Sequence, residues 1–93
     1  MKAIHPGRIL RRELKARGLS ANALALALVA PSGRIVDSLN GKRGVSPKTA
    51  LRLARFFGAS ALFWLSLQTA TELAVAEAAH GKRIAAEVSP AAA

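Results

Sequence analysis

Two short helical patterns, separated by a break, lie within residues 19–43, which read LSANALALALVAPSGRIVDSLNGKR. The first begins at Ser20, a residue type that caps helix N-termini, and Leu24 and Leu28 follow at i, i+4 spacing on one helix face. The break comes just before Pro31, because the residue preceding a proline disfavours the right-handed helical conformation. The first helix is therefore predicted to stop within the two residues before that proline.

The second pattern spans residues 32–39, where Ile35 and Leu39 again stand at i, i+4 spacing and face the core. The positions predicted to face outward are Gly33, Arg34, Asp37 and Ser38. Asn40–Gly41 closes this helix, since both residue types tolerate a positive φ, and Lys42–Arg43 begins a basic loop. Two short helices, a tight turn and a basic loop predict a helix-turn-helix unit. In such a unit the second helix enters the major groove of DNA and the loop reaches flanking phosphates.

Three further helices are predicted around this unit from their start and stop signals. Their bounds are His5–Pro6 to Gly18, Ser46–Pro47 to Gly58, and Ser60 to Ala79, the last terminated by Gly81. The abundance of alanine favours helices, and the β-branched residues are too scattered to build a sheet. We therefore predict an all-α fold of five helices in one domain, residues 1–93, with a core over about 4–80 and a tail over 81–93.

Leucine and aromatic side chains are expected to fill the core. The inner face of the fourth helix is predicted to be Leu51, Leu53, Ala54 and Phe57, and the aromatic core Phe56, Phe57, Phe63 and Trp64. The serines near helix starts, Ser20, Ser32, Ser46 and Ser60, are predicted to be caps. No histidine is placed to activate them as nucleophiles, so no catalytic residue is expected.

The charge balance points to a polyanionic partner. The chain has 93 residues, with 14 Lys and Arg against 5 Asp and Glu, a net charge of +9. Nucleic acid is the first expectation, with an anionic membrane surface and an acidic protein as alternatives. There is no cysteine, and His5 and His80 have no ligand partner at suitable spacing, so neither a metal nor a cofactor is expected. The longest uncharged stretch, residues 56–71, is shorter than the ~20 residues of a membrane span, and we expect a cytoplasmic protein.

Several segments together resemble the HigA antitoxins, which belong to the XRE class of helix-turn-helix proteins. These segments are residues 5–10, 19–25, 34–35 with 39–43, 49–58 and 63–65, and they span about Ile4 to Gln68. The resemblance implies a five-helix fold like that of lambda repressor. It also implies a homodimer that binds double-stranded operator DNA, represses its own operon and neutralises a RelE-like mRNA-cleaving toxin.

Carried over by position, the resemblance also implies which residues contact DNA. Base contacts would come from Ser32, Gly33, Arg34, Asp37 and Ser38. Backbone contacts would come from Asn22, Asn40, Lys42, Arg43 and Lys48. For Arg34, a bidentate contact to guanine, a phosphate contact and an ion pair with Asp37 all remain open.

Two residues depart from the family's pattern. Val29 occupies the turn position where relatives usually carry glycine, and a β-branched residue there would strain or remodel the turn. Leu26 stands where relatives often have a polar residue, and would be an exposed contact point. The basic residues of the first helix, Arg8, Arg11, Arg12 and Lys15, are interpreted as a solvated face or a partner contact.

Two other functions compete with the antitoxin reading. One is a free-standing XRE-family repressor without a toxin partner, and the other is an amphipathic protein of the membrane surface. A fifth helix that is apolar around much of its circumference favours a dimer, with Leu65, Leu73 and Ala76 suited to close two-fold packing.

Overall fold

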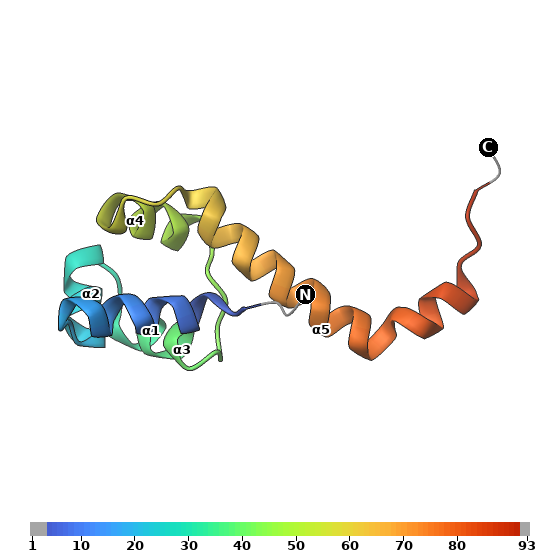
Figure 1. Ribbon diagram of the computed structural model, residues 1–93, viewed down its shortest axis with the longest axis horizontal. Helices are drawn as coiled ribbons and strands as arrows, with labels where there is room; N and C mark the ends of the chain where they lie inside the picture. The colour runs from blue at the N-terminus through green and yellow to red at the C-terminus, as the bar shows by residue number, and fades with distance from the viewer. Residues whose placement is uncertain (1–3, 92–93) are drawn as a thin grey trace.

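The computed structural model describes residues 4–91, and over this range it contains α-helices and no strand. The helices are α1 (Pro6–Arg17), α2 (Ala21–Leu28), α3 (Ser32–Leu39), α4 (Pro47–Phe57) and α5 (Ala61–Glu87). The first four and the start of α5 form a bundle, from which the rest of α5 projects (Figure 1). The predicted all-α fold with five helices is confirmed over the described part of the chain.

Local capping signals explain where the helices begin. Ser20, Ser46 and Ser60 each accept a hydrogen bond from the backbone N–H three residues later, and His5 Nδ1 accepts one from Gly7 at 2.9 Å. Ser32 differs, because it is already the first helical residue of α3. The cap position before it is Pro31, which has no side-chain acceptor, so the predicted cap at Ser32 is wrong.

The core forms where α1, α2, α3, α4 and the start of α5 meet, and Trp64 is the largest of its fully buried side chains. Leu24, Leu28, Ile35 and Leu39 are all buried, as their spacing predicts. The other fully or nearly buried apolar residues are Leu10, Leu14, Ala25, Val45, Ala50 and Leu53. The helix-turn-helix unit is therefore held to the bundle by its predicted apolar faces.

Three apolar residues predicted in the core are exposed instead. Leu51, Phe56 and Phe63 keep 64%, 41% and 43% of their surface accessible. The buried stripe of α4 runs through Ala50 and Leu53, and each helical residue is turned by about 100° from its neighbour. Leu51 therefore lies off the stripe, and Phe63 is displaced in the same way from its neighbour Trp64.

The turn between α2 and α3 keeps the geometry of a glycine although it contains Val29. The residue has φ 54° and ψ 50°, and it is the one non-glycine with positive φ among residues 4–91. The turn closes through bonds from Val29 N–H to the Leu26 carbonyl and from Ala30 N–H to the Ala25 carbonyl. The left-handed conformation costs a side-chain-bearing residue about 1–2 kcal/mol, so the turn is strained and not remodelled. Leu26 is exposed, as expected for a position where relatives often have a polar residue.

The fifth helix is longer than predicted, because it continues through Gly81 to Glu87. Glycine inside a helix costs about 1 kcal/mol relative to alanine, and the alanines on both sides, with a side-chain pair between Arg83 and Glu87, offset this. The predicted end at Ala79 is therefore wrong.

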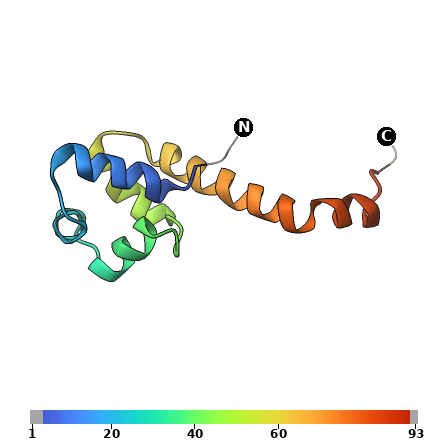
Figure 2. The same ribbon diagram turned by 60° about the horizontal axis from the view of Figure 1, so that its bottom comes forward.

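This long helix also sets the shape of the molecule, which measures 52 × 24 × 23 Å. The radius of gyration is 16.2 Å, against about 12 Å for a compact domain of this length. Beyond Gln68 no residue of α5 is buried, and the second view shows the helix standing clear of the bundle (Figure 2). Between residues 4 and 91, no helix is both long and apolar enough to cross a bilayer.

Candidate nucleic-acid interface

The outer face of α3 presents small and hydrogen-bonding side chains. Ser32, Gly33 and Arg34 are exposed, and a methyl group added at Gly33 would meet no atom within 4 Å. Asp37 is half-buried, and the ion pairs of the described residues do not include one between it and Arg34. The Arg34 guanidinium is therefore open to a ligand.

Val36 is a further exposed residue of this face that sequence reasoning missed. It lies three and four residues after Gly33 and Ser32, the spacing that places residues on one side of a helix. An apolar side chain at such a position can contact the methyl group of thymine.

Ser38 does not belong to the outer face of α3, and the prediction that it faces outward is wrong. Its side chain is 1% exposed, and its hydroxyl has no hydrogen-bond partner among the described residues. The reason is helical spacing, since Ser38 stands three residues after buried Ile35 and one before buried Leu39. The backbone at Ser38 also lies close to α1, since a Cβ at Gly7 would be 2.3 Å from the Ser38 carbonyl oxygen.

The basic loop after α3 is held by backbone hydrogen bonds. The amides of Lys42 and Arg43 donate to the Asp37 carbonyl at 2.9 and 3.3 Å. Both side chains are exposed. The backbone of both residues is thus fixed at the C-terminal end of α3, and their cations are exposed there.

Arg11, from α1, fixes the same end of α3. Its Nε donates to the Leu39 carbonyl at 3.0 Å, and its Nη2 donates to Asn40 Oδ1. Arg11 is exposed, as the interpretation of a solvated face expects, but it also makes these contacts to α3, which the interpretation did not include. The last carbonyls of a helix need donors, but nothing in the sequence reveals that this one comes from 28 residues away. Asn40 is exposed and keeps its amide N–H groups for another acceptor.

A second tether joins the loop to α5. Gln68 is buried, its Oε1 accepts from the Val45 amide at 3.1 Å, and its Nε2 donates to Glu72 at 2.9 Å. Gly44 lies against the same side chain, since a Cβ there would be 2.6 Å from Gln68 Cδ. Sequence reasoning also missed Gln68, because an amide within a helix carries no signal of a distant backbone partner.

The remaining predicted residues, Asn22 and Lys48, are exposed in the first turns of α2 and α4. No acidic side chain lies in either first turn, so the free amides and the helix dipole there suit an anion. The structure therefore presents all the predicted DNA-contacting residues at the surface apart from Ser38 and the half-buried Asp37. Residues 4–91 hold no group of three His, Cys, Asp or Glu placed to bind a metal.

The contribution of the two loop cations to DNA binding can be tested. If Lys42 and Arg43 contact phosphates, replacing either with alanine should weaken binding to every duplex alike, because phosphate contacts carry no sequence information. Each replacement should reduce the slope of log K against log salt by about 1. Titration of labelled duplexes at several salt concentrations measures this slope. An unchanged slope would mean that the two cations lie away from the DNA.

Comparison with known proteins places the chain among antitoxins. No protein-family model matches it. Virulence-associated protein I of Dichelobacter nodosus is 54% identical over 78 residues, which are 83% of this chain and 72% of that protein. An addiction module antidote protein of the HigA family from Coxiella burnetii superposes with a TM-score of 0.92 at 47% identity, over 98% of this chain and 100% of the other. The Pseudomonas aeruginosa antitoxin HigA, solved with the higBA promoter, has a TM-score of 0.93 at 43% identity, over 98% of this chain and 100% of the other.

Proposed function

The chain belongs to the HigA family of antitoxins, and from this membership we propose that it binds operator DNA, represses its own operon and neutralises a cognate toxin. The observation that carries the DNA-binding part is the exposed face of α3, with Arg34 open and Lys42 and Arg43 held beside it. A HigA antitoxin of the same fold is bound to a promoter, which supports the same role here. The net charge of +9 favours a polyanion in the same way.

The binding mode follows from the geometry of the unit. The N-terminal part of α3 enters the major groove, where Arg34 reads a guanine through O6 and N7. Lys42 and Arg43, with Asn22, Asn40 and Lys48, contact the sugar-phosphate backbone and set the register. Arg11 and Gln68 do not contact DNA in this scheme, because they are occupied in holding the ends of the loop.

The toxin part of the proposal concerns a RelE-like mRNA-cleaving partner, and co-expression tests it. The chain should co-purify with the product of the neighbouring open reading frame. That product should cleave mRNA after separation from the chain, and not before. A chain that binds its operator but leaves this product free and active would instead be a free-standing repressor of the same fold.

The same proposal includes a homodimer formed through the projecting part of α5. Leu73, Val75 and Ala76 are exposed there, beside an open groove of about 430 Å³. The groove is lined by His5, Gly41, Gly44, Gln68, Thr71, Glu72, Val75, Ala76, Ala79 and His80. Leu65, also expected at the interface, packs against the core of its own protomer.

Sedimentation of the free protein should therefore give the mass of a dimer at micromolar concentration. The physical reason is that a second copy would cover apolar side chains that the protomer leaves in water. Val75→Glu, which places a charge within the groove, should shift the equilibrium toward the monomer. The same substitution at Leu62, an exposed residue outside the groove, is the matched control. A wild-type monomer at that concentration contradicts the proposed dimer.

A further inference from the structure

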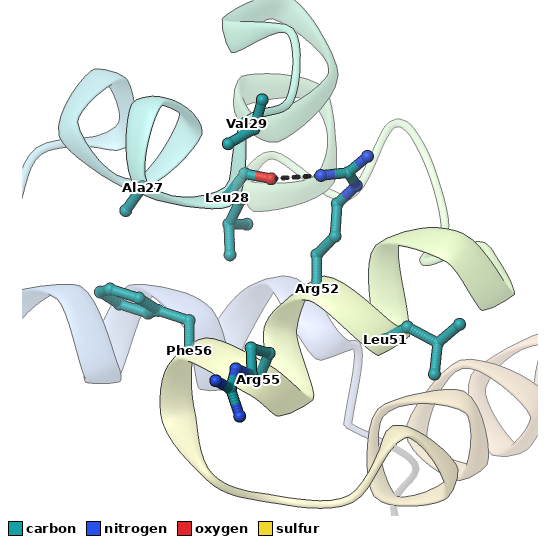
Figure 3. A pocket seen from close by; sticks show the side chains of 7 residues that line it. All are labelled: Ala27, Leu28, Val29, Leu51, Arg52, Arg55 and Phe56. Carbon is teal, nitrogen blue, oxygen red and sulfur yellow. Dashed lines mark hydrogen bonds between the residues drawn. The ribbon is translucent and has the colours of Figure 1, made fainter.

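An apolar groove lies between the C-terminal end of α2 and α4 (Figure 3). It is open to solvent, has a volume of about 460 Å³ and is lined by Ala27, Leu28, Val29, Leu51, Arg52, Arg55 and Phe56. Its lining combines apolar side chains with two arginines and contains no acidic residue. The groove is thus an apolar surface with a positively charged rim, and none of its residues belongs to the proposed DNA or dimer surfaces.

The strain at Val29 is not offset by burial of its side chain. Its backbone is left-handed, with φ 54°, and its side chain is 78% exposed, so burial does not repay the unfavourable conformation. Glycine would adopt the same conformation without a steric conflict. Backbone strain that the surrounding structure holds in place clusters at functional sites. We therefore infer that the exposed Val29 side chain, at the edge of the groove, is contacted by a binding partner.

The two arginines define the chemistry of that occupant. Arg52 Nη1 donates to the Leu28 carbonyl at 2.8 Å, which holds the guanidinium at the end of α2 (Figure 3). Arg55 is exposed beside Phe56. Remaining guanidinium N–H groups bind carboxylates well, and arginine with aromatic and aliphatic side chains is the composition of protein interfaces. A phosphate backbone would use the arginines but leave the apolar residues uncovered.

We propose that this groove is the docking site for the toxin, which places apolar side chains against Val29, Leu51 and Phe56 and carboxylates against Arg52 and Arg55. The proposal rests on the antitoxin function proposed above. It assigns the toxin to a surface separate from α3, so that the chain can hold toxin and operator through different residues.

Val29→Gly is the decisive variant, because stability and binding should move in different directions. Relief of the strain should leave Tm unchanged or raise it by a few degrees, even though glycine adds freedom to the unfolded chain. Loss of the side chain should weaken binding of the neighbouring gene's product, purified separately as the probe, by roughly tenfold. Calorimetric titration and thermal unfolding measure the two quantities. If the Val29 side chain had a structural role alone, its removal would lower Tm and leave the affinity of the folded variant for the probe unchanged.

Two further variants and a control test the chemistry of the site. Leu51→Ala should weaken binding of the same probe without loss of stability, because the Leu51 side chain is already exposed. Arg55→Ala should weaken binding of the probe and reduce the salt dependence of that binding, since a charge pair with a carboxylate of the toxin is removed. Leu62→Ala removes a leucine of similar exposure outside the groove and should bind normally.

The possible failures are distinguishable. A wild-type chain that does not bind the probe contradicts the toxin partnership itself. Normal binding by Val29→Gly and Leu51→Ala, with a wild-type chain that binds, contradicts the groove alone. A lower Tm for Val29→Gly overturns the strain argument. Selective loss of operator affinity assigns the groove to DNA, and dissociation of the dimer assigns it to a second copy.

Discussion

Replacing Trp64 with alanine should lower the free energy of unfolding by about 3–5 kcal/mol, the largest effect on stability that we expect from a single change. The indole is 1% exposed and lies between the rings of Phe57 and Phe63, whose centroids are 5.9 and 5.3 Å from its own. Its removal would leave a cavity between α4, α5 and the rest of the bundle. Since small domains have only about 5–15 kcal/mol of stability, much of the variant should be unfolded near its working temperature. Urea denaturation followed by far-ultraviolet circular dichroism measures the loss.

Trp64→Phe is the matched control. The indole Nε1 is buried without a hydrogen-bond partner among the described residues, so phenylalanine removes an unsatisfied donor while it keeps most of the apolar volume. The loss of stability should be much smaller than for alanine. Equal losses for the two variants would show that a phenylalanine ring does not restore the packing of the indole, which contradicts the argument from apolar volume.

Arg34→Ala should cost about 1–3 kcal/mol of binding free energy on the cognate operator and much less on random duplex. Arg34 is the one long donor on the outer face of α3, whose neighbours Ser32 and Gly33 offer little side chain. Discrimination at one base pair per half-site should therefore relax. Binding to both duplexes at one fixed salt concentration provides the measurement.

The control for this prediction is Arg12→Ala, which removes the same charge from an exposed position of α1. This variant should weaken binding to the cognate and the random duplex slightly and equally. If Arg34→Ala also weakens cognate and random DNA in parallel, Arg34 contacts phosphate, and specificity lies in DNA shape. Toxin neutralisation should survive Arg34→Ala, because the groove beside Val29 is a separate surface.

The fold could be predicted from the sequence because its signals are local. Serine caps, prolines at first helical positions and glycines at helix ends act through neighbouring backbone, so the bounds of α1, α2 and α4 lie close to those expected, while α3 has its expected range without the expected serine cap. The predicted end of α5 is wrong because a local stop signal was overridden by its neighbours. Gly81 is a stop signal only when the flanking residues do not favour helix, and here they are alanine-rich.

The candidate interface was predictable only in part, because exposure depends on what packs against each face. The prediction drawn from the spacing of Ile35 and Leu39 places Arg34 outside correctly, but it also places Ser38 outside, and that residue is buried. Arg11 and Gln68 act across 28 and 23 residues of sequence on backbone atoms, and such partners carry no sequence pattern. Val29 is the opposite case, since its strain is visible from the residue type once the turn is recognised.

The projecting part of α5 has a consequence for the lifetime of the chain. From Glu72 onward the helix is supported by its own hydrogen bonds and side-chain pairs, with no buried residue to resist opening. Such segments open locally far more often than the whole domain unfolds, and opened backbone is what proteases cleave. A protomer whose α5 is uncovered should therefore be digested from this end first, while a copy that covers it would protect it. Turnover of the protein would then depend on its own concentration, with dilute chains removed faster than assembled ones.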